Sequence, residues 1–481
     1  MSRFDRRRFL EDSMFAAAAA VTAGGVVPAF AEEKQSTSPN ERLNVAIIGV
    51  NGRGGSHIGG FTSRKDTPIT WLVDCDREVG QKRVDAVAKK QGFAPKFATD
   101  MREMLEDKEV DVVSIATPNH WHALAAIWAI QAGKDVYVEK PVSHNVSEGR
   151  RIVEAARKHN KICQTGTQCR SMPGSQEAIA YMKAGKIGQV KIARGLCYKT
   201  RNSIGPRGTY EVPASVDYNL WAGPAPMSPL TRPKFHYDWH WQWECGNGDL
   251  GNQGIHQVDV ARWGLDVHQL CDAVFSYGGR LGYQDAGETA NTQVCTFDYG
   301  DKQLIFEVRG LKTDAYRDAK VGNVFHGTDG YVVLTSYNSG AAFNPAGEKV
   351  AEFKGGNDQL HYDNFVKAVR SRNHKDLNAD IEEGHLSSAL CHLGNISLRL
   401  GSPTSIADAK AKLQGEANVE TYDRFAKHLD ENNVSGGSEI HFGQSLKLDP
   451  KAETFVNNTQ ADTMLTREYR APFVVPAAGQ V

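Results

Sequence analysis

The sequence predicts an α/β protein with two domains: a doubly wound parallel sheet, followed by an α+β domain with a largely antiparallel open sheet. Between residues 43 and 166, short apolar runs alternate with helical patterns, as expected of parallel strands that are covered on both faces. A glycine-rich turn follows the first apolar run directly. From residue 273 onward, strand-like runs follow one another with short turns, which is typical of an antiparallel sheet.

The elements follow from these patterns in order. Apolar runs predict strands at residues 43–48, 70–73, 110–116, 135–138 and 162–165, and helical patterns predict helices at 77–90, 120–132 and 147–159. In the second domain we expect strands at 273–277, 293–299, 303–309 and 331–335, and helices at 257–265, 359–372 and 381–400. We place the two domains at 43–166 and 167–400. The C-terminal extension 401–481 shows no clear pattern, and we expect it to wrap a domain or mediate subunit contacts.

Composition excludes several classes of partner. The 481 residues include 56 basic and 57 acidic side chains, a net charge of -1, so no overall field exists to hold nucleic acid or anionic lipid. We therefore expect no nucleic-acid partner. The eight cysteines are scattered without a Cys-x-x-Cys pair, and we expect them to be small buried hydrophobic side chains.

The first 31 residues predict an export signal. Residues 6–10 read RRRFL, a weakly apolar stretch follows, and residues 29–31 read AFA, which is the order of a basic region, an apolar region and a small-residue cleavage site. The twin-arginine start resembles signals that carry folded proteins across the bacterial inner membrane. We expect a signal at 1–31, a polar linker at 32–42, and a periplasmic or otherwise exported protein whose membrane contact is limited to the signal.

The turn after the first strand resembles a dinucleotide-binding loop. Residues 49–54 read GVNGRG, close to the Gly-x-Gly-x-x-Gly fingerprint of Rossmann domains. Asn51 replaces the second glycine, and asparagine tolerates a positive φ better than most residues. We expect Gly49, Asn51, Gly52, Arg53 and Gly54 to bind the pyrophosphate of the cofactor.

Asp74 closes the second predicted strand, where an acidic side chain accepts hydrogen bonds from the adenosine ribose. A carboxylate there favours NAD because it repels the 2′-phosphate of NADP. NADP stays an alternative because Arg77 lies close enough in the sequence to accept a phosphate.

Two further motifs carry a family resemblance. Residues 116–122 read ATPNHWH after the fourth strand, and Glu139-Lys140-Pro141 follows the fifth. With these motifs the chain resembles the Gfo/Idh/MocA oxidoreductases from Leu43 to about Leu400. The resemblance implies a lysine, Lys140, beside the nicotinamide and the reacting hydroxyl, and a proline that commonly follows a strained or cis bond. It implies cofactor contacts from Thr117, Pro118, Asn119, His122, Glu139 and Lys140.

The chemistry of a lysine at that place is consistent with hydride transfer. Removing hydride from a C–H bond requires the proton of the attached hydroxyl to leave, and a lysine near a cationic nicotinamide can have a lowered pKa that suits this task.

Residues 246–259, GNGDLGNQGIHQVD, are similar to the family's Gly-Gly-Gly-x-Leu-x-Asp-x-Gly-x-His-x-x-Asp segment. His256 matches the substrate-side histidine, a general acid or base because imidazole titrates near neutral pH. Asn252 replaces the family's aspartate and can orient His256 or hold a hydroxyl, but it cannot take a proton. The catalytic candidates are Lys140, His256 and Asn252.

A tryptophan-rich segment, residues 236–245 (HYDWHWQWEC), lies between these motifs. On an extended chain the tryptophans share one face, and His236, His240 and Glu244 share the other. Aromatic faces suit the apolar side of a sugar ring, so we expect substrate contacts from His236, Trp239, His240 and Asp249. A zinc site using His236, His240, Glu244 or His256 is the alternative explanation, but a hydrogen-bonded wall is commoner, and we expect no metal.

The resemblance implies an NAD(P)-dependent oxidoreductase that acts on a sugar, polyol or related carbohydrate with a tightly bound cofactor, and a homo-oligomer formed through the open sheet. One alternative is an NAD-dependent glycoside hydrolase that works by oxidation, elimination and reduction, although the Tyr-Pro-Thr-His-Gly segment usual in those relatives is absent from this sequence. The other alternative is a metal-binding family member without redox turnover.

Overall fold

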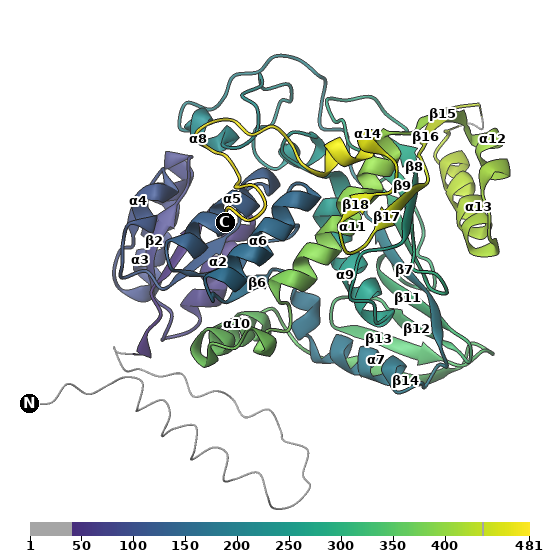
Figure 1. Ribbon diagram of the computed structural model, residues 1–481, viewed down its shortest axis with the longest axis horizontal. Helices are drawn as coiled ribbons and strands as arrows, with labels where there is room; N and C mark the ends of the chain where they lie inside the picture. The colour runs from purple at the N-terminus through teal and green to yellow at the C-terminus, as the bar shows by residue number, and fades with distance from the viewer. Residues whose placement is uncertain (1–40, 435–436) are drawn as a thin grey trace, which may run out of the picture.

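The computed structural model describes residues 41–434 and 437–481, and these build two sheets joined by helices (Figure 1). The predicted export signal and nearly all of the predicted linker lie outside the described residues. The first sheet is parallel, with six strands in the order β3-β2-β1-β4-β5-β6. Its strands are β1 Val45–Ile48, β2 Ile69–Val73, β3 Lys96–Ala98, β4 Val112–Ile115, β5 Asp135–Val138 and β6 Cys163–Thr165. This confirms the predicted doubly wound sheet, and its strand order reverses between β1 and β4, where open α/β sheets bind ligands.

Helices connect these strands and flank the sheet: α2 Arg53–Thr62, α3 Arg77–Gln91, α4 Met101–Leu105, α5 Asn119–Gln131 and α6 Val146–Lys158. Their starts have local causes. The Asp76 carboxylate accepts hydrogen bonds from the first-turn amides of α3, and the Asn145 side chain caps α6 in the same way, because both side chains satisfy amides that have no partner inside the helix.

The second sheet has twelve strands, and most of its pairs are antiparallel. The main path runs β14-β13-β12-β11-β7-β10-β9-β8-β16-β15, and β17 pairs with β8 and β18. The strands are β7 Val190–Tyr198, β8 Ala273–Gly279, β9 Thr292–Asp298, β10 Gln303–Arg309, β11 Val321–Gly327, β12 Tyr331–Leu334, β13 Ser339–Phe343, β14 Lys349–Lys354, β15 Ser402–Ser405, β16 Glu439–Phe442, β17 Leu446–Asp449 and β18 Thr454–Phe455. The prediction of a largely antiparallel sheet is confirmed, and the pair β7 and β10 is the parallel exception.

Helices cover both faces of this sheet. The core on one face is formed with α7 Pro173–Lys183, α9 Ile255–Gly264 and α11 Ile381–Arg399. On the opposite face, α13 Glu416–Glu431 packs Tyr422 and Phe425 against Tyr277 and Ile305 of the strands. Alternate residues of one strand therefore serve two cores, as the pleat requires. The remaining helices are α8 Tyr218–Ala222, α10 Gln359–Ser371, α12 Ile406–Ala409 and α14 Thr459–Asp462.

The C-terminal extension is built into the molecule. Strands β15 and β16 continue the large sheet beyond β8, and the last part of the chain returns to the first domain, where it passes α8 and ends beside α5 (Figure 1). There Phe473 packs edge-on against Trp121 with ring centroids 5.4 Å apart. Of the two expectations for this extension, the packing of its end against the first domain agrees with wrapping a domain.

Two smaller expectations concern cysteines and membranes. All eight cysteines are free thiols, and all except the half-buried Cys75 are buried, which confirms them as apolar packing groups. Within residues 41–434 and 437–481, no helix combines the length and apolarity that a membrane crossing requires.

Candidate active site

A cavity of about 440 Å³ lies at the carboxyl ends of the parallel strands. We call it the cofactor cleft. Most of the residues expected from sequence line it, namely Gly49, Asn51, Gly52, Arg53, Asp74, Thr117, Pro118, Asn119, His122, Glu139, Lys140, His236, Trp239, His240 and Asn252. Gly54, Asp249 and His256 are not among its lining residues. The cleft thus brings motifs from both domains to one place.

The glycine turn leaves room for a phosphate. Gly49 has a φ of 79°, and a Cβ there would lie 2.8 Å from the carbonyl carbon of Ala116, so no other residue fits. A Cβ on Gly54 would lie 2.0 Å from the carbonyl oxygen of Gly49, which explains why Gly54 packs behind the turn. Helix α2 starts at Arg53 with no side-chain cap and no acidic residue in its own first turn. Such a helix N-terminus suits an anion, so the turn fits a pyrophosphate.

Asp74 is fixed at the end of β2. Its two carboxylate oxygens accept hydrogen bonds from the amides of Val50 and Asp76, both at 2.9 Å. Burial raises the pKa of Asp74, and these two amides oppose the shift. Because a carboxylate oxygen accepts more than one hydrogen bond, the group keeps capacity for a ribose hydroxyl.

Lys140 lies where the two domains meet. Its Nζ donates a 2.8 Å hydrogen bond to the main-chain oxygen of Asn252, and the Lys140–Pro141 bond is cis. Burial lowers the pKa of the lysine amine; Glu139 opposes this shift, while the cations Arg53 and Lys199 add to it. The amine therefore loses its proton more readily than an exposed lysine does.

Glu139 is occupied by the protein. Its Oε1 accepts hydrogen bonds from Arg53 Nε at 2.7 Å and from His57 Nε2 at 3.0 Å. Burial alone would raise the pKa of Glu139, but Arg53 and His57 hold it well below its ordinary value. The carboxylate therefore stays charged and fixes Arg53 across the cleft, and its direct contact with a cofactor stays a prediction.

His256 is the second residue of α9, immediately after a π-helical turn, Leu250–Gly254, that contains Asn252. The imidazole is buried, its ring centroid lies 4.9 Å from that of Tyr337, and its Nδ1 has no hydrogen-bond partner among the described residues. Burial lowers the pKa of His256 well below 6.5, and the charge of Lys140 lowers it further. These shifts favour the neutral imidazole, which can both donate and accept a hydrogen bond, over the titration near neutral pH that the motif alone suggests.

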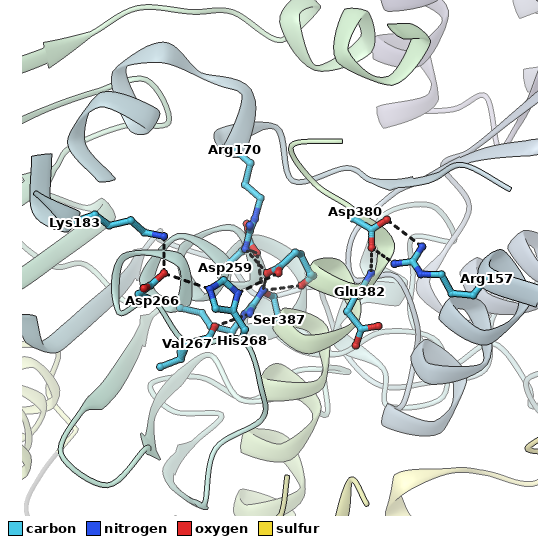
Figure 2. A network of polar contacts seen from close by, with 12 residues as sticks. Arg157, Arg170, Lys183, Asp259, Asp266, Val267, His268, Asp380, Glu382 and Ser387 are labelled. Atoms are coloured by element: carbon cyan, nitrogen blue, oxygen red, sulfur yellow. Dashed lines mark hydrogen bonds and ion pairs between the residues drawn. The ribbon is translucent and has the colours of Figure 1, made fainter. Parts of the chain in front are cut away.

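A buried polar network fixes α9, the helix that carries His256. Arg170 donates two hydrogen bonds, of 2.8 and 2.9 Å, to the carboxylate of Asp259, one turn after His256. Ser387 of α11 donates a 2.7 Å hydrogen bond to the same carboxylate. Figure 2 shows Arg170, Asp259 and Ser387 pointing toward one another, with Lys183, Asp266 and His268 at one side of the group. The network joins α9 to α11 and to the chain that follows β6.

The segment at 236–245 differs from its prediction. Residues Asp238–Trp241 form a 3-10 turn, so the tryptophans and histidines do not separate onto two faces. Trp239 and His240 stack at 3.6 Å between centroids, and both line the cofactor cleft. Trp241 instead packs with Ile204 and Ala286.

Asp249, expected to contact the substrate, and Glu244, a ligand of the alternative zinc site, both have partners within the protein. Asp249 is buried and accepts hydrogen bonds of 2.6 and 2.8 Å from Arg201. Its carboxylate therefore holds Arg201 and does not line the cofactor cleft. Glu244 accepts a hydrogen bond from Ser228. Across the part of the chain that the structure describes, no three His, Cys, Asp or Glu side chains gather as a metal-ligand set.

One side of the cofactor cleft is covered by a segment of the second domain that the sequence did not predict to lie there. Residues 200–247, here called the covering segment, belong to the second domain and contact the first domain beside the cofactor cleft. The amide of Asp217 donates to the carbonyl of Cys75 at 2.9 Å, and the amide of Arg77 donates to Ser215 at 3.0 Å. His236 contacts Asp76 at 3.0 Å. The covering segment supplies Tyr237, a lining residue that sequence reasoning missed, together with Leu220 and Trp221.

A second cavity of about 620 Å³ is lined mainly by residues of the second domain. Its polar lining includes Lys199, Gln253, Tyr337, Asn338 and Asp358. Gln253 follows Asn252 in the chain, the Tyr337 ring is tilted against that of His256, and the Asp358 carboxylate lies 3.6 Å from the Arg53 guanidinium of the cofactor cleft. The two cavities have no lining residue in common, but the adjacent residues Asn252 and Gln253 line one cavity each.

This geometry defines a two-domain dinucleotide-binding protein, and comparison with known families agrees. A family model described as "Oxidoreductase family, NAD-binding Rossmann fold" matches residues 43–167, and one described as "Oxidoreductase family, C-terminal alpha/beta domain" matches residues 198–425. Together these models match well over half of the chain. The chain belongs to the Gfo/Idh/MocA oxidoreductase family, and its first domain is an NAD-binding Rossmann domain.

Individual relatives are more distant. The chain is 28% identical over 241 residues to a levoglucosan dehydrogenase of Pseudarthrobacter phenanthrenivorans, covering 49% of this chain and 54% of that protein. It is 30% identical over 184 residues to an alpha-N-acetylgalactosaminidase of Shewanella oneidensis, covering 34% and 39%. The chain thus spans about half or less of the length of these curated relatives. A solved levoglucosan dehydrogenase with NADH and levoglucosan shares the fold, with a TM-score of 0.57 and 19% identity over 73% of this chain and 97% of that one.

Proposed function

We propose that the protein is an NAD-dependent oxidoreductase that acts on the CH–OH group of a sugar, polyol or related carbohydrate. The observation that carries this proposal is the position of Lys140, a buried amine with a lowered pKa that lines the cofactor cleft and hydrogen-bonds Asn252 of the second domain. NAD, when bound, supplies the hydride acceptor. All other steps belong to residues of the chain.

The proposed roles follow from the contacts. The Asn252 carbonyl orients the Lys140 amine, which takes the hydroxyl proton as the C–H bond breaks. The neutral His256 imidazole, with its free Nδ1, hydrogen-bonds a neighbouring hydroxyl. The glycine turn and the stacked pair Trp239 and His240 hold the cofactor in the cleft. The carbohydrate binds beside Lys140, and the polar residues Gln253 and Tyr337 of the second cavity are the candidates to contact its further hydroxyls, which need donors and acceptors alike.

The covering segment supports a tightly bound cofactor. Its backbone hydrogen bonds to the first domain at Cys75 and Arg77 must break before a nucleotide can leave through that side. Retention suits an exported enzyme, because no free nicotinamide pool exists outside the cytoplasm. Net turnover then requires a second substrate: one carbohydrate reduces the bound NAD, and another carbonyl compound reoxidises it.

A screen of sugars and polyols tests the redox function. Purified protein with bound NAD should gain the fluorescence of reduced nicotinamide when the correct substrate is added, and Lys140→Ala should keep the nucleotide but show no gain. Absence of any fluorescence change over a broad screen, with nucleotide present, would count against the redox assignment.

Glycoside hydrolysis is the second candidate, because relatives named as glycosyl hydrolase family 109 proteins share 29 to 30% identity with part of the chain. Transient oxidation of a glycoside acidifies the neighbouring C–H bond, so elimination, water addition and reduction would use the same lysine and NAD. Release of nitrophenol from a nitrophenyl glycoside without net formation of NADH selects this function. NADH formation without release selects the first.

We also propose export by the twin-arginine route, with cleavage after Ala31. The support is the sequence of residues 6–10 and 29–31. N-terminal sequencing of protein from a periplasmic fraction should begin at Glu32, and replacing Arg6 and Arg7 together by lysine should leave the protein in the cytoplasm. Periplasmic delivery of that double variant would exclude this route.

A further inference from the structure

The last segment of the chain, residues 466–481, bonds directly to the covering segment. We call it the C-terminal strap. The Arg470 guanidinium donates to the Asn219 side-chain oxygen at 2.6 Å, to the Asn219 carbonyl at 2.8 Å and to the Gly223 carbonyl at 3.1 Å. These three hydrogen bonds span both ends of α8. One side chain therefore fixes the helix whose residues Leu220 and Trp221 line the cofactor cleft.

A second arginine of the strap fixes the other end of the covering segment. Arg467 Nη1 donates to the carbonyl of Glu244 at 2.9 Å and lies 3.2 Å from His144 Nδ1 on the first domain. His144 Nε2 in turn contacts the carbonyl of Trp243 at 2.8 Å. Arg467 thus bridges the first domain and the covering segment.

The strap has its own attachment to the first domain. Phe473 is buried against Trp121 and Trp128 of α5, and the Lys158 ammonium of α6 hydrogen-bonds the carbonyl of Val481. Trp121 also donates a 2.9 Å hydrogen bond to the carbonyl of Leu220. Because the strap is anchored on α5 and α6, its arginines hold the covering segment against a fixed base.

Neither arginine lines the cofactor cleft, so any effect on the cofactor passes through the covering segment. Charge-assisted hydrogen bonds to carbonyl groups are among the stronger polar contacts in proteins, and the guanidinium of Arg470 makes three of them at once. We propose that Arg467 and Arg470 are positioning residues that keep the covering segment closed over the bound nucleotide and thereby set the rate at which it leaves. This proposal rests on the tightly bound cofactor of the proposed function.

The experiment measures the release of NADH from the loaded, full-length mature protein, followed by nucleotide fluorescence with an excess of NAD as trap. Arg470→Ala should release NADH about tenfold faster or more, Arg467→Ala should act in the same direction, and Arg470→Lys should fall between Arg470→Ala and the parent. Arg207→Ala is the matched control, because Arg207 lies on the covering segment but pairs with Glu288. Its release rate should equal that of the parent.

A second variant protects the test against misfolding. Asn219→Ala changes an exposed residue and removes the side-chain acceptor of Arg470, so it should speed release while thermal stability stays near that of the parent. Equal release rates in the parent, Asn219→Ala and Arg470→Ala would overturn the strap proposal and leave the proposed function intact. A parent protein that holds no nucleotide would overturn both.

Discussion

Lys140 is the residue whose environment has the clearest chemical consequence. Burial lowers the pKa of its amine below the ordinary 10.5, so the uncharged base appears at a lower pH than in free lysine. The rate of carbohydrate oxidation, as kcat/KM, should therefore rise with pH and level off once the amine is deprotonated. Lys140→Ala should lower kcat by about 10²- to 10⁴-fold with the nucleotide content unchanged.

The matched variant is Lys140→Arg, which keeps the positive charge but stays protonated. It should lack the rising limb of the pH profile and stay inactive up to alkaline pH. A rising limb of the same midpoint in Lys140→Arg would assign the titration to another group.

Sequence predicted the residues of the site that lie in short local motifs. The glycine turn, Asp74, Glu139 and Lys140 each follow a buried strand, and parallel strands end at one edge of a sheet. Tyr237 and Tyr337 could not be predicted in this way, because long-range packing brings Tyr237 of the covering segment to the cofactor cleft and Tyr337 to the second cavity. The neutral state of His256 has the same origin: burial is a tertiary property, and the bare motif suggests the ordinary titration of imidazole.

At the scale of elements, strands were predicted best where burial on both faces gives a continuous apolar run in the sequence. Strands β1, β4 and β5 are buried along their whole length and were found as apolar runs. Strand β15, Ser402–Ser405, carries a proline and no large apolar residue, so its place in the sheet depends on pairing with β16. Strand β7 was not among the predicted strands, because Lys191 and Arg194 interrupt its apolar pattern. Arg194 is buried in the structure, where Thr421 and Glu420 accept its hydrogen bonds.

The network that fixes α9 gives a stability prediction for an element. Asp259→Ala should lower the free energy of unfolding by about 3–5 kcal/mol, because it leaves the buried guanidinium of Arg170 without its main partner. Lys183→Ala breaks the exposed pair of Lys183 with Asp266 (Figure 2) and should cost about 0–1 kcal/mol. Urea unfolding followed by tryptophan fluorescence measures the free energy of unfolding of both variants. Equal losses in the two variants would show that the buried pair contributes no more to stability than the exposed pair.

At the scale of the whole molecule, the open sheet bears on self-association. On the face of the large sheet that lies opposite α7, α9 and α11, helix α13 packs against β8, β9 and β10. The part of that face near Tyr331 and Phe343, whose rings stack at 4.9 Å, is the part that α13 does not cover. We predict a homo-oligomer that uses this remaining part. Light scattering after size exclusion should report more than one chain, and Tyr331→Glu should reduce it to a single chain. A single chain for the parent protein at every concentration would refute the prediction.

The arrangement of the two domains around one cleft leads to the most direct measurement. Mature protein, folded in the cytoplasm, is purified, denatured and analysed for released nucleotide by mass spectrometry. The structure predicts close to one NAD or NADH for each chain, and strong depletion when Gly49 is replaced by valine, because a side chain there collides with Ala116. Protein that releases no nicotinamide nucleotide, even after incubation with NAD, would contradict the account.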